Sequence, residues 1–178
     1  MTNEQKAQRI KMILMDVDGT LTDGSLLLLS AGEELKSYNV RDGMGILIAS
    51  LAGLKTGIIT GKISEPLKKR AEKLKILELH QGILDKKSIL LDICQRHALE
   101  PEDIAYIGDD LGDLDIMEAV GFSGAVGDAH PKVIKQCHYQ CSKPGGKGAV
   151  REFIEFIINA QGKWNLIEEK ISELTKIK

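Results

Sequence analysis

Short apolar runs alternate with segments of helical spacing along most of this chain, and this alternation restricts the possible fold more than any other feature. The apolar runs occupy residues 12–15, 56–59, 104–107 and 123–126. The segments whose apolar residues recur at helical spacing occupy residues 43–51, 64–74, 87–97 and 113–120. Because right-handed crossovers place helices on both faces of a parallel sheet, the pattern predicts an α/β fold with a doubly wound, Rossmann-like parallel sheet.

The length and charge of the chain exclude several classes of protein. Its 178 residues fit a single domain, residues 1–178, with a core that needs no metal or disulfide crosslinks. A formal net charge of −2 leaves no basic field to hold nucleic acid or an anionic membrane. Residues 1–11 lack an apolar leader segment, and the 3 cysteines are too few for a disulfide framework. We therefore expect a soluble, cytoplasmic protein.

Two segments depart from the alternation. Residues 24–40 contain a run of leucines at 26–29 and a turn-like stretch after it, which predicts a β-hairpin inserted after the first strand. This insertion is too short to form a separate cap domain. Residues 163–178 are typical of an amphipathic tail helix that docks on a surface. Its apolar stripe consists of Trp164, Ile167, Ile171 and Leu174.

Acidic residues follow two of the apolar runs. Asp16 and Asp18 come directly after the first run, and Asp109, Asp110 and Asp113 follow the third. Because ligands bind beyond the carboxyl ends of parallel strands, we expect these acids to converge at one edge of the sheet. Carboxylates held together repel one another unless a cation joins them, and Mg²⁺ prefers oxygen ligands. The two clusters together predict a Mg²⁺ site, although Asp16 and Asp18 alone would fit a helix-capping turn equally well.

Residues that could hold a phosphate lie beside these acids. Thr60 and Gly61 follow the second apolar run and offer a hydroxyl and backbone N–H groups, and Lys86 offers a positive charge. Taken singly, Thr60 also fits a helix cap, and Lys86 also fits a solvated helix start. A carboxylate such as Asp16 can act as a nucleophile and form an aspartyl-phosphate.

Taken in chain order, these residues resemble the four motifs of the haloacid dehalogenase superfamily of phosphohydrolases. The resemblance rests on Asp16-x-Asp18-Gly-Thr, Thr60-Gly61, Lys86 and Gly108-Asp109-Asp110-x-x-Asp113. Further segments are similar to those of the 3-deoxy-D-manno-octulosonate 8-phosphate (KDO 8-phosphate) phosphatases, short members without a separate cap domain that act in lipopolysaccharide biosynthesis. These segments are Gly32-Glu33-Glu34-Leu35-Lys36, Asn39-Val40-Arg41-Asp42-Gly43, Asp128-Ala129-His130-Pro131 and Gly145-Gly146-Lys147-Gly148-Ala149-Val150-Arg151-Glu152.

The resemblance implies a reaction and a role for each matched residue. The reaction is the Mg²⁺-dependent hydrolysis of KDO 8-phosphate to the free sugar acid and phosphate through an aspartyl-phosphate. Asp16 would be the nucleophile and Asp18 the general acid–base, while Thr60 and Lys86 would hold the phosphoryl oxygens. The implied metal ligands are Asp16, Asp18 through its backbone carbonyl, and Asp109, with Asp110 and Asp113 close by. The implied substrate-binding residues are Asn39, Val40, Arg41, Asp42, Gly43, Thr60, Gly61, Lys62, Arg70 and Lys86.

Two other functions fit parts of the sequence. One is a phosphatase of a nine-carbon, sialic-acid-like (KDN or Neu5Ac) 9-phosphate, but that branch commonly has Glu where this chain has Lys62. Many relatives in the eight-carbon branch carry Arg at the positions of Leu47 and Lys62, so the sequence departs from that pattern too. The basic side chain of Lys62 nevertheless favours the eight-carbon substrate. The other is a non-catalytic oligomeric binding module, which predicts loss of Asp16 or Asp18, and both are present.

The family also implies partners. These are a small phosphorylated sugar acid and further copies of the chain, in a homotetramer. A physical reason for assembly is that an isolated two-stranded hairpin is marginal in water, so a leucine-rich hairpin gains stability by pairing with others.

Overall fold

A six-stranded parallel sheet forms the centre of the protein. The computed structural model describes residues 1–30, 32 and 34–176. The strand order is β5-β4-β1-β6-β7-β8, and every neighbouring pair in this sheet is parallel. The predicted doubly wound parallel sheet is confirmed. In chain order its strands are β1 (Met12–Met15), β4 (Lys55–Thr60), β5 (Glu78–Gln81), β6 (Ile104–Gly108), β7 (Phe122–Ala125) and β8 (Tyr139–Gln140).

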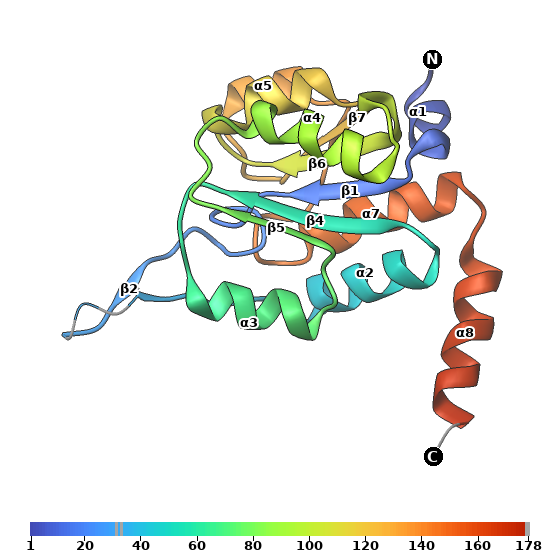
Figure 1. The fold of residues 1–178 in the computed structure, drawn as a ribbon, viewed down its shortest axis with the longest axis horizontal. Coiled ribbons are helices and arrows are strands. Elements are labelled where there is room, and N and C mark those ends of the chain that lie inside the picture. Colours follow the sequence, from blue (N-terminus) through green and yellow to red (C-terminus); the bar gives the residue numbers. More distant parts are fainter. Residues whose placement is uncertain (31, 33, 177–178) are drawn as a thin grey trace.

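Helices cover both faces of this sheet (Figure 1). One face carries α2 (Val40–Leu51), α3 (Glu65–Lys73) and α7 (Ala149–Ala160), and the other carries α4 (Lys86–His97) and α5 (Leu114–Ala119). Two short helices that the sequence did not predict pack against these layers, α1 (Asn3–Arg9) on α7 and α6 (Pro131–Gln136) on α5. Two 3₁₀ turns, η1 (Pro101–Asp103) and η2 (Leu111–Asp113), flank β6.

The four predicted strands correspond to β1, β4, β6 and β7, and their ends differ from the prediction by at most one residue. These strands are almost entirely buried because helices cover them on both sides, which explains their continuous apolar runs. The strands β5 and β8 were missed. Both lie at the edges of the sheet and are only partly buried, so their sequences carry polar residues.

The order of the strands places a switch point at β1. From β1 the chain moves outward through β4 to β5, and it then returns to the other side of β1 to form β6 and β7. The carboxyl ends of β1, β4 and β6 therefore flank the position where ligands bind in doubly wound sheets.

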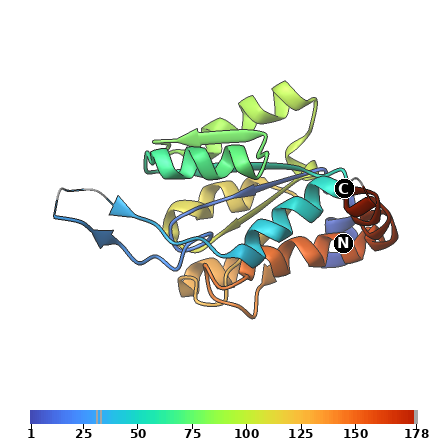
Figure 2. The same ribbon diagram turned by 90° about the horizontal axis from the view of Figure 1, so that it is seen from below.

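The predicted hairpin insertion is present in the described residues and projects from the body of the protein (Figures 1 and 2). It consists of β2 (Leu27–Leu28) and β3 (Glu34–Leu35), which pair antiparallel. Among the described residues between β1 and α2, no other strand or helix occurs, so a separate cap domain is absent there. Within the predicted segment 24–40, Ala31 and Glu33 lie outside the described residues.

The predicted C-terminal helix is α8 (Trp164–Lys176). Ile167 is fully buried and the ammonium of Lys170 donates to the carbonyl of Leu51 at 2.7 Å, so the first half of the helix docks on α2. Farther along, Ile171 and Leu174 are exposed, and residues 177–178 lie outside the described part of the chain. None of the described helices has the length and apolarity needed to cross a membrane.

Candidate active site

The ends of three strands and one helix meet around a cavity of about 280 Å³ at the switch point. Asp16 follows β1, Thr60 ends β4, Asp109 follows β6, and Lys86 begins α4. The sequence-predicted residues that line this cavity are Asp16, Asp18, Thr60, Gly61, Lys62, Lys86, Asp109, Asp110 and Asp113. The convergence of the two acidic clusters at one edge of the sheet is therefore observed.

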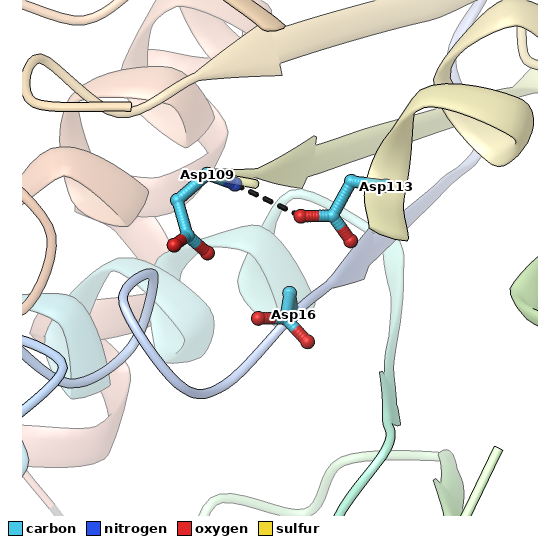
Figure 3. Close-up of side chains that lie close together, drawn as sticks. All are labelled: Asp16, Asp109 and Asp113. Carbon is cyan, nitrogen blue, oxygen red and sulfur yellow. Dashed lines mark hydrogen bonds between the residues drawn. The ribbon is translucent and has the colours of Figure 1, made fainter. Parts of the chain in front are cut away.

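Three carboxylates lie closest together in this cavity (Figure 3). One oxygen each of Asp16, Asp109 and Asp113 falls within 4.8 Å of the others. Asp16 and Asp113 are buried, and Asp109 is partly buried. The side chain of Asp18 lies in the same cavity, but it is not part of this group of three.

The electrostatics of this cluster favour a bound cation. Burial, followed by repulsion from Asp113, raises the pKa of Asp16 to about 6. Burial and the charge of Asp16 raise the pKa of Asp109 to about 8. A divalent cation removes this repulsion, and Mg²⁺ takes carboxylate oxygens as ligands. The described group contains carboxylates and no imidazole or thiolate, and such oxygen donors fit Mg²⁺.

Lys86 supplies the positive charge that the protein's own side chains place in the acidic cluster. Its ammonium donates to Oδ1 of Asp16 and Oδ1 of Asp113, both at 2.6 Å, and to the hydroxyl of Tyr106 at 3.0 Å. Burial alone would lower the pKa of Lys86, but the charges of Asp16 and Asp113 outweigh it, and the pKa is raised. Lys86 therefore stays charged, and its three N–H groups are all engaged.

Asp113 organises the cluster rather than offering free oxygens. Its Oδ1 accepts from Lys86 and from the Tyr106 hydroxyl, the latter at 2.6 Å. Its Oδ2 accepts from the backbone N–H groups of Asp109 at 2.9 Å and Asp110 at 3.2 Å. A Cβ at Gly108 would lie 2.3 Å from the same Oδ2, so this close approach requires glycine.

The Gly-Thr pair after Asp18 supports Asp109. Thr20 is fully buried, and its hydroxyl donates to Oδ1 of Asp109 at 2.9 Å. Gly19 has a φ of +90°, and a Cβ there would lie 2.1 Å from Oδ2 of Asp109. The motif Asp-x-Asp-Gly-Thr thus shapes the strand end so that the second acidic cluster can pack against it.

The remaining acids make other contacts. The carboxylate of Asp18 pairs with the ammonium of Lys36, 2.5 Å away, and Lys36 lies on the segment that follows β3. Asp110 accepts from the backbone N–H of Leu111 at 2.7 Å and so caps η2.

Several predicted substrate-binding residues lie outside the cavity of Asp16. Asn39 caps α2 by accepting from the N–H of Arg41, and its amide donates to the carbonyl of Gly146. Val40 and Arg41 are exposed. Asp42 is 1% exposed, and its carboxylate accepts from the backbone N–H groups of two residues at the start of α7. The structure thus gives Asp42 a capping role, and the substrate contact that the resemblance implies for it stays a prediction.

Gly43 and Arg70 form a second group. A Cβ at Gly43 would lie 2.5 Å from Nη2 of Arg70, so the glycine makes room for the guanidinium. The two residues line a groove between α2 and α3 that is separate from the cavity of Asp16. Lys62 lies in that cavity, and its ammonium is 3.6 Å from Oε1 of Glu34 on the hairpin.

Sequence reasoning missed Lys36, Thr20 and Tyr106 as site residues. Tyr106 is the lone polar side chain in the apolar run of β6, and such a residue in a fully covered strand requires a buried partner. That signal could have identified Tyr106. Lys36 lies in a segment that carries the family resemblance, but its contact with Asp18 depends on the path of the hairpin.

Comparison with known proteins agrees with this geometry. A sequence model of the haloacid dehalogenase-like hydrolases matches residues 55–154. The chain is 44% identical over 158 residues to the 3-deoxy-D-manno-octulosonate 8-phosphate phosphatase of Salmonella typhi, covering 89% of this chain and 84% of that one.

Solved structures of relatives share the fold. The phosphatase of the same description from Yersinia pestis superposes with a TM-score of 0.89 at 42% identity, covering 91% of this chain and 88% of that one. The Moraxella catarrhalis phosphatase, solved in complex with magnesium ion, phosphate ion and KDO, gives a TM-score of 0.91 at 37% identity over 95% of this chain and 97% of that one. This chain therefore belongs to the haloacid dehalogenase-like hydrolases, in the family of the KDO 8-phosphate phosphatases.

Proposed function

We propose that the protein is a Mg²⁺-dependent phosphatase that hydrolyses KDO 8-phosphate to the free sugar acid and phosphate, a step of lipopolysaccharide biosynthesis. The observation that carries the proposal is the cluster of Asp16, Asp109, Asp113 and Lys86 at the switch point of the sheet. The substrate class is supported by the relatives, which are KDO 8-phosphate phosphatases at 44% identity.

In the first step a carboxylate oxygen of Asp16 attacks phosphorus, and the bond from phosphorus to the sugar oxygen breaks. Asp18 donates a proton to that oxygen as it leaves. Asp16 forms a salt bridge with Lys86. The ammonium of Lys86 keeps positive charge next to the nucleophile and the transferred phosphoryl group. Thr60 is buried at the end of β4 and lines the same cavity, where its hydroxyl would hold a phosphoryl oxygen.

The carboxylates of Asp16 and Asp109 and the backbone carbonyl of Asp18 would hold Mg²⁺. Asp113 is close by, but its two oxygens are already engaged by Lys86, Tyr106 and backbone N–H groups. When bound, the ion supplies a divalent charge that offsets the negative charge of the nucleophile and the phosphoryl group.

The second step returns the enzyme to its starting state. Asp18, now ionised, takes a proton from a water molecule that attacks the phosphorus of the aspartyl-phosphate. Phosphate leaves, and the carboxylate of Asp16 is regenerated next to Lys86.

The sugar acid carries a carboxylate in addition to its phosphate, so cations beyond Lys86 should recognise it. Lys62 lines the cavity, and Arg70 lies in the neighbouring groove beside Gly43. We expect Arg70→Ala to raise KM for KDO 8-phosphate while leaving KM for p-nitrophenyl phosphate, which has no carboxylate, unchanged. Equal effects on both substrates would assign Arg70 a purely structural role.

We further propose that the protein assembles into homotetramers in the cytoplasm. The hairpin exposes neighbouring leucines at 44–72% of their surface, and pairing with hairpins of other subunits would bury them. Cys94, Cys137 and Cys141 are all unpaired, which suits a reducing compartment.

Phosphate release from a panel of sugar phosphates with Mg²⁺ present tests the substrate. The panel contains KDO 8-phosphate, a nine-carbon sialic-acid-like 9-phosphate, a neutral sugar phosphate and p-nitrophenyl phosphate. The proposal predicts the highest kcat/KM for KDO 8-phosphate. A higher kcat/KM for the nine-carbon substrate would replace the proposed substrate, and no turnover of any member would contradict a phosphatase.

A further inference from the structure

The segment that leaves the hairpin turns alternate side chains toward the body of the protein. Glu34, Lys36 and Tyr38 are partly buried, whereas Leu35 and Ser37 between them are exposed. Because side chains alternate in extended chain, the three partly buried residues share one face. Lys36 on this face reaches Asp18, which lines the cavity of the acidic cluster.

Lys36 is unusually enclosed for a lysine on an insertion. Its side chain is 4% exposed, and its ammonium lies 2.5 Å from Oδ1 of Asp18. The same side chain lines a second cavity of about 420 Å³, between the hairpin and the loop before α3. A lysine with a charged head is rarely this buried unless a paired acid compensates for the lost hydration. The contact with Asp18 is therefore a defined structural feature rather than a solvent-exposed ion pair.

Glu34 places a second negative charge near the ammonium of Lys36. Its Oε1 is 3.8 Å from Nζ of Lys36 and 3.6 Å from Nζ of Lys62. No hydrogen-bond donor among the described residues reaches this buried oxygen, so its attraction to the two ammonium groups is electrostatic. Glu34, Lys36 and Asp18 thus form a chain of alternating charge from the hairpin to the active site.

We propose that Lys36 is a positioning residue for Asp18, and that through it the hairpin takes part in catalysis. The inference rests on the proposed role of Asp18 as the general acid–base. The bond from Lys36 holds Oδ1 of Asp18 and fixes the orientation of the carboxyl group. Oδ2 is then the oxygen that gives its proton to the leaving sugar oxygen, and Oδ1 of the protonated carboxyl still accepts from Lys36. Asp18 remains 26% exposed at the side chain, so it is open to the cavity where that oxygen arrives.

The competing role is direct recognition of the substrate carboxylate by Lys36. The two roles differ in which substrates depend on Lys36. Protonation by Asp18 matters for every alkyl phosphate, because an alkoxide is a poor leaving group, and it matters little for p-nitrophenyl phosphate, whose phenolate leaves unaided. Carboxylate recognition matters for the sugar acid alone.

Lys36→Met, which removes the charge and keeps the length, separates the two roles. We would measure kcat/KM for KDO 8-phosphate, for a neutral sugar phosphate and for p-nitrophenyl phosphate with saturating Mg²⁺. This ratio reports the steps up to phosphoryl transfer, where the leaving group departs. Lys36→Arg is the conservative variant. Lys11→Met is the matched control, because Lys11 forms an exposed ion pair with Asp103, 3.1 Å away, at the opposite end of the sheet.

The proposal predicts that Lys36→Met lowers kcat/KM for both alkyl phosphates by about 10- to 100-fold, chiefly through kcat. This loss is smaller than the roughly 10²–10⁴-fold that general acid–base catalysis contributes, because the variant keeps Asp18 and removes only the contact that orients it. For p-nitrophenyl phosphate the change should stay below about threefold, because its leaving group needs little protonation. Lys36→Arg should recover part of the lost kcat, and Lys11→Met should match the unmodified enzyme.

Three results would overturn the inference. A loss confined to KDO 8-phosphate and expressed in KM assigns Lys36 to the substrate carboxylate. Equal losses with all three substrates assign it to the architecture of the site, and no loss with any of them removes it from catalysis. Failure of the proposed function is seen separately, because it appears as a poor kcat/KM of the unmodified enzyme for KDO 8-phosphate relative to the other sugar phosphates.

Discussion

The ammonium of Lys86 lies 2.6 Å from Oδ1 of Asp16, although the two residues are 70 positions apart in the chain. One residue follows β1 and the other begins α4, so the contact exists only because the sheet brings the strand end and the helix start to the same edge. The contact leaves the nucleophile of the proposed reaction paired with a permanent cation in a buried site. Charge of the opposite sign at this distance favours the ionised form of Asp16 that the attack requires.

The hydroxyl of Tyr106 stabilises the contact between Lys86 and the acidic cluster, and Tyr106→Phe should weaken that contact. The hydroxyl accepts from Lys86 and donates to Asp113, and its removal leaves a buried ammonium and a buried carboxylate each short of one partner. Hydrogen bonds to charged groups contribute about 1.5–3 kcal/mol, so we expect a lower melting temperature and a roughly tenfold or greater loss of kcat.

Tyr139→Phe provides the matched control for that experiment. Tyr139 also donates its hydroxyl to an acid, Glu152 at 3.3 Å, but it lies on the edge strand β8. Thermal unfolding and steady-state kinetics of both variants with KDO 8-phosphate make the comparison. If Tyr106→Phe kept the kcat of the unmodified enzyme, the hydroxyl would have no part in organising Lys86.

The acidic cluster predicts a pH-dependent response to Mg²⁺. In the folded protein without metal, the pKa of Asp109 is raised to about 8 and that of Asp16 to about 6, from an ordinary value of 3.8. The folded state therefore binds protons that the unfolded chain has released, and stability falls as pH rises from about 4 to 8. Mg²⁺ replaces those protons, so the rise in melting temperature that it produces should be larger at pH 8 than at pH 5.

Thermal unfolding in EDTA and in Mg²⁺ at the two pH values measures this response. For a chain of this size, each kcal/mol of stability corresponds to about 2–4 °C in melting temperature. In EDTA, the melting temperature of Asp109→Asn should depend much less on pH than that of the unmodified protein. The variant removes the acid whose pKa is raised most. A Mg²⁺ effect of the same size at both pH values would contradict the metal site as described.

The exposed leucines of the hairpin predict that the protein assembles with further copies of itself. Leu27 is 60% exposed and Leu28 is 72% exposed, so Leu27→Asp and Leu28→Asp place charge on the surface that would pair with other subunits. We expect both variants to lose the tetramer in light scattering. Leu91→Asp is the control, since Leu91 is 64% exposed on α4 and lies in no proposed interface. A monomeric mass for the unmodified protein at full activity would rule out the tetramer.

The sheet could be predicted from the sequence where burial is complete and not where it is partial. β1 and β6 are covered on both sides, so their residues are continuously apolar and the chain marks them clearly. β5 is different, because Glu78 and His80 lie at the sheet edge. Glu78 accepts from His80, Arg96 and His97, contacts that stabilise a partly buried strand without an apolar pattern.

The convergence of the proposed catalytic residues could be predicted because strand order alone brings strand ends together. Asp16, Thr60 and Asp109 needed no knowledge of side-chain packing to be placed at one edge. The contacts of Lys36 and Asp42 could not be predicted without knowledge of side-chain packing. Lys36 reaches Asp18 through the path of the hairpin, and Asp42 bonds backbone groups more than 100 positions away at the start of α7. Contacts of this kind depend on how the elements pack, which local patterns do not encode.

Chemical trapping of the phosphorylated enzyme tests the central claim most directly. The enzyme is mixed with KDO 8-phosphate and Mg²⁺, quenched in acid during turnover and treated with borohydride, which reduces an acyl phosphate to an alcohol. Mass spectrometry of the peptide that contains Asp16 and Asp18 then locates the change, and Asp16→Asn, which cannot form the acyl phosphate, serves as the control. The account predicts that Asp16 is reduced to homoserine and that Asp16→Asn releases no more than trace phosphate. Phosphate release with Asp16 unreduced, or full turnover by Asp16→Asn, would contradict it.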